Sequence, residues 1–165
     1  VPEEQRTQRL GDAIVPGDIL KLSGDLERGR KLFHESTVVL CRNCHRISAK
    51  GTEIGPDLDG IGKKLDRVKM LESILQPSLQ IEPKYVMWLV ETSAGTVHTG
   101  LLVKRDAESV VLKDAKNNQV TIPAKEVDGI FPQTKSLMPE LLVRDFTAQQ
   151  MIDLLEYLGS LKSPP

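Results

Sequence analysis

The sequence predicts an α+β protein in which helical stretches near both ends flank a strand-rich middle. Apolar residues recur at helical spacing before residue 76 and again after residue 147. Between about Tyr85 and Gln133, short segments rich in β-branched residues alternate with turn-forming residues. The composition, 39% apolar and 27% charged, is that of an ordinary globular chain, and 165 residues fit one domain or one domain with an insert.

The first predicted helix lies within residues 23–36, where Ser23 or Asp25 can cap the N-terminus. Before it, residues 1–22 form a lead-in segment that Pro16 and Gly17 predict to be irregular. The residues on the apolar stripe of this helix are Leu26, Gly29, Leu32 and Phe33.

The second predicted helix begins after Asp66, its expected cap, and ends at Gln76 because a residue before proline avoids the helical region. Residues 51–65, which precede it, are rich in Gly and Pro and are expected to form a loop. The residues that this helix is expected to bury are Val68, Leu71, Ile74 and Leu75.

The third predicted helix has the clearest boundaries. Thr147 and Gln150 form a capping box at its start, while Gly159 and Pro164 mark its end. Its apolar face consists of Met151, Ile152, Leu154, Leu155 and Leu158.

Five strands are expected between the second and third helices, separated by the turns "SAG", "RDAE" and "AKNN". Five short antiparallel strands ordinarily curl into a small barrel, which protects their edges. We therefore expect an SH3-like or Sm-like barrel of roughly 50 residues, inserted between the helices. The expected strands lie at 85–92, 96–104, 109–114, 119–123 and 129–133.

The charge pattern argues against polyanion binding and membrane insertion as the main activity. The formal net charge is −1, so no strong field draws the chain to nucleic acid. No run approaches the 18 apolar residues that suggest a membrane span, and the N-terminus lacks the pattern of a signal peptide. We expect a mature protein or an excised domain, whose oligomeric state the sequence leaves open.

Residues 41–45 read "CRNCH" and contain the only two cysteines of the chain. A disulfide between Cys41 and Cys44 would close a tiny loop and constrain little of the chain. C-x-x-C-H is instead the signature of covalent haem attachment. The two thiols can add to the two vinyl groups of a porphyrin, and the imidazole of His45 can then bind the iron.

Three other interpretations of this segment remain open. A thioredoxin-like redox pair would be expected at a strand-to-helix junction, whereas this motif follows a helix. A structural zinc site needs four ligands, so His34 or His98 would have to join Cys41, Cys44 and His45. The cysteines could also form a plain buried pair.

A low-spin haem also needs a second axial ligand, from methionine or histidine. Met138 is the candidate, because it lies in a loop before the last helix, where Pro139 stiffens the backbone. Met70 and Met151 are expected in helix cores, and His34 at the surface or as a cap. The remaining eligible side chains, Met87 and His98, lie in predicted strands.

With these motifs in place, the sequence resembles a class I cytochrome c. More closely, it is similar to the haem-binding domain of planctomycete and verrucomicrobial proteins, from near Gly11 to the end of the chain. The segments that carry the resemblance are "GDLERGRKLF", "CRNCHRI", "IGPDLDGIGKKLDR", "ESILQPS", "VHTGLLV", "VTIP" and "SLMPE".

The resemblance implies a split cytochrome, in which a β-barrel at 84–133 interrupts an all-α core made of 23–83 and 134–165. It further implies one covalent haem c, with the iron bound by His45 and Met138. Ninety-three positions separate these two residues, and the predicted strands account for much of that distance.

Roles for other residues follow from the same resemblance. The carbonyl of Pro56 would accept a hydrogen bond from Nδ1–H of His45 and fix its tautomer, and Leu58 would pack on the haem edge. Gly29 would allow the first and last helices to cross closely, with Phe33 and Tyr157 at the contact.

The function implied is one-electron transfer by a carrier that is not an enzyme by itself, although it can be a domain of a larger dehydrogenase. Its redox partners would be a periplasmic dehydrogenase and a respiratory chain, and the maturation of covalent haem implies a periplasmic or other extracytoplasmic location. Two alternatives remain: a haem-based gas or redox sensor with a displaceable Met138, and a protein-docking module that uses the barrel.

Overall fold

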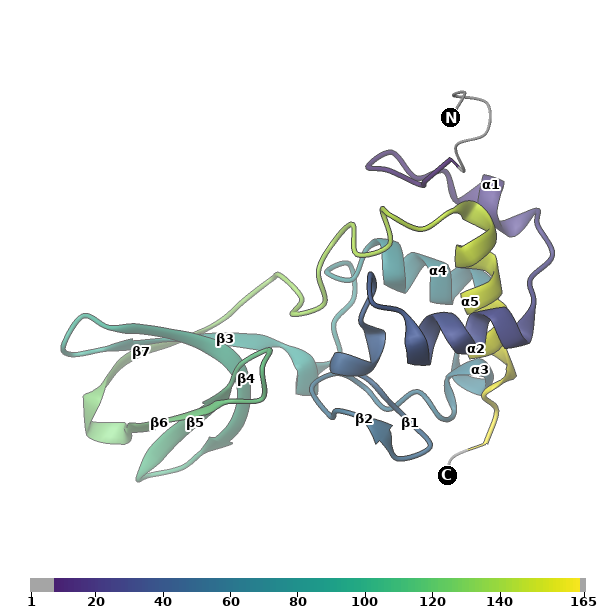
Figure 1. The fold of residues 1–165 in the computed structure, drawn as a ribbon. Coiled ribbons are helices and arrows are strands. Elements are labelled where there is room, and N and C mark those ends of the chain that lie inside the picture. The colour runs from purple at the N-terminus through teal and green to yellow at the C-terminus, as the bar shows by residue number, and fades with distance from the viewer. Residues whose placement is uncertain (1–7, 164–165) are drawn as a thin grey trace. The chain divides into compact units, whose positions relative to one another are not determined.

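The computed structural model describes residues 8–163 and shows a mixture of helices and an antiparallel sheet, which confirms the α+β class. Contacts between residues divide the chain into two compact units, whose segments can be found in Figure 1 by their residue-number colours. The first contains Val1–Gln76 and Glu140–Pro165, and the second contains Pro77–Pro139. Each unit is described by itself below.

The first unit is mainly helical, and its last helix, α5 (Ala148–Ser160), is almost entirely buried along its apolar face. Figure 1 shows α2 crossing α5, with α4 on the far side of α5. The other elements are α1 (Pro16–Leu20), α2 (Leu26–Glu35), the 3₁₀ turn η2 (Cys41–Asn43), β1 (Arg46–Ile47), β2 (Lys50–Gly51), α3 (Ile61–Lys64) and α4 (Arg67–Leu75).

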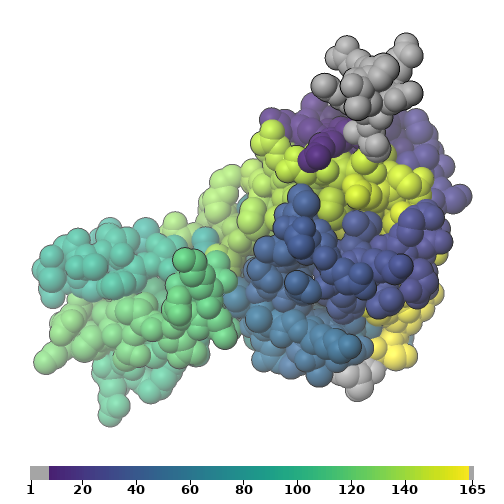
Figure 2. Space-filling view, viewed as in Figure 1, coloured from purple at the N-terminus to yellow at the C-terminus, as the bar shows by residue number. Residues whose placement is uncertain are grey.

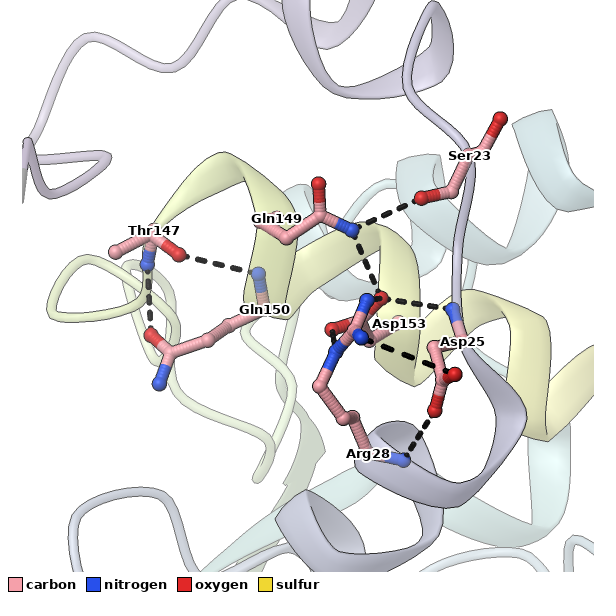
Figure 3. Close-up of polar contacts among 7 residues, drawn as sticks. All are labelled: Ser23, Asp25, Arg28, Thr147, Gln149, Gln150 and Asp153. Carbon is pink, nitrogen blue, oxygen red and sulfur yellow. Dashed lines mark hydrogen bonds and ion pairs between the residues drawn. The ribbon is translucent and has the colours of Figure 1, made fainter.

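The predicted helix caps are confirmed. The side chain of Asp25 accepts a hydrogen bond from the backbone N–H of Arg28 at the start of α2, and Asp66 caps α4 in the same way. At the start of α5, Thr147 and Gln150 form both hydrogen bonds of a capping box (Figure 3). These caps satisfy backbone donors that have no partner inside the helix.

Some details of the helices differ from the prediction. The lead-in segment contains the short helix α1, which begins at Pro16 because proline is favoured in the first helical turn. The segment that was expected to be wholly loop contains α3. Val68 is 58% exposed, contrary to the prediction, whereas Leu71 is buried and Ile74 and Leu75 are partly buried against the core. Residues 1–7 lie outside the described part of the lead-in.

The close crossing of α2 and α5 is confirmed at Gly29. A Cβ atom at this position would lie 1.9 Å from the carbonyl oxygen of Asp153, so only glycine fits without moving a helix. Phe33 and Tyr157 are both buried beside the crossing, with ring centroids 6.2 Å apart. The two helices therefore touch through their backbones as well as through their apolar side chains.

A second contact between the same helices is polar, and Figure 3 shows it in detail. Asp153 is 2% exposed, and its carboxylate accepts hydrogen bonds from the backbone N–H of Asp25, from Nε and Nη2 of Arg28 and from Nε2 of Gln149. Burial by itself raises the pKa of Asp153, but these donors outweigh burial and lower it below its usual value. We call these four residues the helix junction.

The second unit is a five-stranded antiparallel sheet, as predicted from the strand-like segments, and its strand order is β6-β5-β4-β3-β7. Val90, Val110, Leu112 and Ile122 form its buried core. Figure 1 shows the sheet strongly curved. The strands are β3 (Met87–Thr92), β4 (Val97–Arg105), β5 (Ser109–Lys113), β6 (Gln119–Pro123) and β7 (Val127–Pro132), and the 3₁₀ turns are η3 (Pro83–Tyr85) and η4 (Ala124–Glu126).

The part of the chain that the structure describes contains no helix that is both long and apolar enough to cross a membrane.

Candidate functional site

The CRNCH segment begins with the 3₁₀ turn η2, which residues 36–40 separate from the end of α2. The backbone N–H groups of Cys44 and His45 donate to the carbonyl oxygen of Cys41, at 3.1 Å and 2.9 Å. Residues three apart in such a turn lie on the same side, so the two thiols are neighbours. Both cysteines are free, and residues 40–60 (blue) reach the surface beside α2 in Figure 2.

The surroundings of the two thiols keep them protonated at neutral pH. Burial raises the pKa of Cys41 to about 11, and it also raises the pKa of Cys44. A thioredoxin-like pair needs the opposite effect, because the thiolate is the attacking species. The electrostatics therefore argue against the redox-pair interpretation.

The loop that follows CRNCH folds back over it and is fixed to it by backbone hydrogen bonds. The N–H groups of Ile54 and Gly55 both donate to the carbonyl oxygen of Cys44, at 3.1 Å and 2.7 Å. The N–H of Thr52 donates to the carbonyl oxygen of Arg42 at 3.2 Å. This arrangement satisfies backbone groups that have no partner in a helix or sheet and makes the segment a defined unit.

His45 is held in one orientation by the same loop. Its Nδ1 lies 2.7 Å from the carbonyl oxygen of Pro56. Because a carbonyl oxygen can only accept a hydrogen bond, Nδ1 carries the proton and Nε2 keeps its lone pair. Burial lowers the pKa of His45, although the hydrogen bond to Pro56 raises it. A neutral imidazole with Nε2 unprotonated is the form that binds a metal ion.

Two glycines allow the backbone to approach His45 this closely. A Cβ atom at Gly55 would lie 2.8 Å from Cε1 and 3.0 Å from Nδ1 of the His45 ring. At Gly51, where φ is +110°, a Cβ atom would lie 2.2 Å from the carbonyl oxygen of His45. Larger residues at these two positions would therefore displace His45 or the loop.

These residues fit a covalently attached haem. The two thiols are free, they are three residues apart, and the adjacent imidazole presents Nε2 as a ligand. Within residues 8–163, no group of three or more His, Cys, Asp or Glu side chains is placed to hold a metal ion.

Cys41, Cys44, His45 and Pro56 are thus brought together. Leu58 is partly buried against the apolar core of the first unit. Met138 belongs to the second unit, where its N–H donates to Oγ of Ser136, and the N–H of Ser136 donates to Oγ of Ser78. The axial role of Met138 and the contact of Leu58 with haem stay predictions.

The other eligible ligands have structural roles. Met70 and Met151 are buried in the helical core, as predicted. His34 is not a simple surface residue, because its Nε2 lies 2.9 Å from the hydroxyl oxygen of buried Tyr157. Its pKa is lowered, chiefly by burial and then by nearby cations. His98 lines a small pocket of the sheet, and Met87 is the first residue of β3.

Three residues of this site were not predicted from the sequence: Gly51, Gly55 and Asp59. The glycines stand in a loop rich in Gly and Pro, and nothing in the sequence singles them out from their neighbours. Asp59 is 5% exposed, although a carboxylate is ordinarily expected at the surface. Only its repeated spacing with Asp57, in "PDLD", could have suggested a local hydrogen-bonded turn.

Comparison with models of known protein families finds no match, and a search of curated proteins finds none either.

Proposed function

We propose that the chain is a c-type cytochrome that transfers single electrons and carries one covalently bound haem. The observation that carries the proposal is the arrangement at CRNCH. Two free thiols lie next in sequence to His45, whose Nδ1–H donates a hydrogen bond to the carbonyl oxygen of Pro56. When bound, haem supplies a reversible one-electron iron couple. In finer detail, we propose a class I cytochrome c core, interrupted by the five-stranded sheet as an SH3-like or Sm-like barrel.

The residues of the chain then have distinct tasks. Cys41 and Cys44 form the two thioether bonds, and His45 binds the iron through Nε2. Pro56 keeps the proton of His45 on Nδ1, which strengthens Nε2 as a donor. Met138 is the proposed second axial ligand and Leu58 an apolar contact of the haem.

If His45 and Met138 both hold the haem iron, no position would be open for a substrate, which favours electron transfer over substrate chemistry. A thioether ligand also favours the ferrous state of the iron more than a second histidine ligand would. We propose that the donor is a periplasmic dehydrogenase, the acceptor a respiratory chain, and the location extracytoplasmic.

The first experiment is an intact mass of the full chain, expressed in cells that mature c-type cytochromes. The expected mass exceeds that of the polypeptide by one haem, and Cys41→Ala/Cys44→Ala returns it to that of the polypeptide. A wild-type mass equal to the bare polypeptide would contradict the proposal.

The second experiment concerns Met138. We expect Met138→Ala to abolish the weak near-infrared sulfur-to-iron band of the oxidised protein, because the axial thioether is lost. Met87→Ala is the matched control and should keep the band. Rapid and complete binding of carbon monoxide by the reduced wild type would instead favour a sensor with a displaceable methionine.

A further inference from the structure

We propose that Asp59 is a positioning residue for His45. Its buried carboxylate would hold the turn between β1 and β2 against the loop that carries Pro56, and so fix the hydrogen bond between Pro56 and His45. The importance of this bond for a bound haem rests on the proposed function, whereas the positioning itself does not.

The turn between β1 and β2 has an unfavourable backbone. Arg46 pairs with Gly51 and Ile47 with Lys50, which leaves Ser48 and Ala49 as a two-residue loop. Their φ angles are 48° and 60°. Such turns usually contain Asn and Gly, because a Cβ atom disfavours the left-handed region. The conformation of Ser48 and Ala49 therefore needs support from outside the turn.

Asp59 supplies that support from the other side of the loop. Its Oδ1 accepts a hydrogen bond from the N–H of Ser48 at 2.8 Å. Asp59 is itself fixed, because its N–H donates to Oδ1 of Asp57 at 2.9 Å. Nε of Arg46 donates to Oδ2 of Asp57 at 2.9 Å, and the N–H of Leu58 donates to the carbonyl oxygen of Arg46 at 3.0 Å. The hairpin and the loop thus form a closed hydrogen-bonded ring.

This ring is continuous with the contacts that hold His45. Arg46 is the next residue in the chain, and Gly51, at the other end of the hairpin, lies against the carbonyl oxygen of His45. Gly55 and Pro56 follow in the same loop and contact the ring of His45. If the turn relaxes, the loop loses its anchor and the carbonyl of Pro56 can move away from Nδ1.

The second carboxylate oxygen of Asp59, Oδ2, also bears on the proposed role. Oδ2 is buried and has no hydrogen-bond partner in the structure. A buried polar atom without a partner is unfavourable, so the carboxylate is not explained by general stability. Its one hydrogen bond goes to the strained turn, and an asparagine could also accept that bond, although a neutral acceptor is weaker.

The test uses the full chain, labelled with ¹⁵N-histidine, and measures hydrogen exchange of Nδ1–H of His45 by nuclear magnetic resonance. We expect hydrogen exchange at Nδ1–H of His45 to become roughly tenfold faster in Asp59→Ala, because the loss of one hydrogen bond lowers the free energy of local opening. Asp59→Asn should stay within about threefold of the wild type, because its side-chain oxygen can still accept from Ser48. In the haem-bound chain, Asp59→Ala should also raise the reduction potential, because His45 becomes a weaker donor.

Two further variants separate positioning from general stability. Ser48→Gly in the background of Asp59→Ala should restore slow exchange, because glycine adopts the left-handed conformation without strain. Asp153→Ala removes an equally buried carboxylate from the helix junction and should lower the melting temperature without changing the exchange of Nδ1–H. If Asp59→Ala does not fold, recovery of folding by Ser48→Gly supports the proposal, and failure to recover overturns it.

Unchanged exchange in Asp59→Ala would overturn the proposal. So would an Asp59→Asn variant that is as impaired as Asp59→Ala, since charge would then matter more than hydrogen bonding. The intact mass keeps the two proposals distinguishable. A chain without haem contradicts the cytochrome function, but exchange at His45 still tests Asp59; a haem-bound chain insensitive to Asp59 contradicts only the positioning role.

Discussion

The helix junction at Asp153 and the hairpin turn at Asp59 each bury a carboxylate, but they use it differently. Asp153 accepts four hydrogen bonds. Two come from Arg28 of α2, one from the backbone N–H of Asp25 just before α2, and one from Gln149 of α5. Asp59 accepts one, from a strained turn, and leaves an oxygen without a partner. The first carboxylate joins two regular elements, whereas the second supports an irregular loop beside the candidate site.

The difference indicates how stability is distributed in the first unit. At the helix junction, hydrogen bonds add to an apolar contact in which Gly29 brings two backbones together. Around His45, the loop is held by backbone hydrogen bonds and by the close approach of glycines. We therefore expect changes at the helix junction to affect global unfolding, and changes at Asp59 to act mainly on His45.

The largest effect is expected for Gly29→Val. The new side chain would meet the carbonyl oxygen of Asp153, so the helices must separate, and we expect a loss of at least about 3 kcal/mol in the free energy of unfolding. Urea denaturation measures it. Gly159→Ala is the control, since a Cβ atom there meets nothing within 4 Å, and it should be neutral or slightly stabilising. Equal stability of Gly29→Val and wild type would show that α2 and α5 are not in close backbone contact at Gly29.

Next in size is the contrast between the two carboxylates. Asp153→Ala leaves several donors without a partner and should lower the free energy of unfolding by about 3 kcal/mol. Asp59→Ala removes one hydrogen bond together with an unpaired oxygen and should lower it by only about 1 kcal/mol. Urea denaturation of both variants at neutral pH checks the order. A larger loss for Asp59 would reverse the comparison.

The smallest effect concerns acid pH. The pKa of Asp153 is lowered in the folded chain, so its ionised form stabilises the fold above the unfolded pKa of about 3.9. This contribution is lost as pH falls from that value through the folded pKa. The stability difference between wild type and Asp153→Asn should therefore be constant near neutral pH and shrink below about pH 4. A difference that stays constant in acid would show that the charge of Asp153 does not stabilise the fold.

Helix ends and strand positions were predictable because their signals are local. The caps at Asp25, Asp66 and Thr147 each use a side chain and a backbone N–H three residues away. Likewise, the predicted strand at 119–123 coincides with β6. The turn-forming residues between strands also appear as expected, with φ of +79° at Gly95 and +65° at Asn117.

Burial was harder to predict, because it depends on partners distant in the sequence. Val68 has the right spacing for a buried face, yet it is 58% exposed. Asp153 interrupts the apolar face of α5 and is still buried, because Arg28 and Asp25 reach it from another helix. Neither result follows from the residues of one helix alone.

The spacing of the two thiols and the imidazole at CRNCH was determined by the sequence itself, since it is a covalent property of five consecutive residues. The caps and strand alternation were determined in the same way, by interactions within a few residues. Only the tertiary structure decided that the loop after CRNCH places Pro56 on His45, and that buried Asp59 supports the Ser48 turn. Those contacts join residues 11 apart through a folded loop, and that geometry depends on the packing of the whole unit.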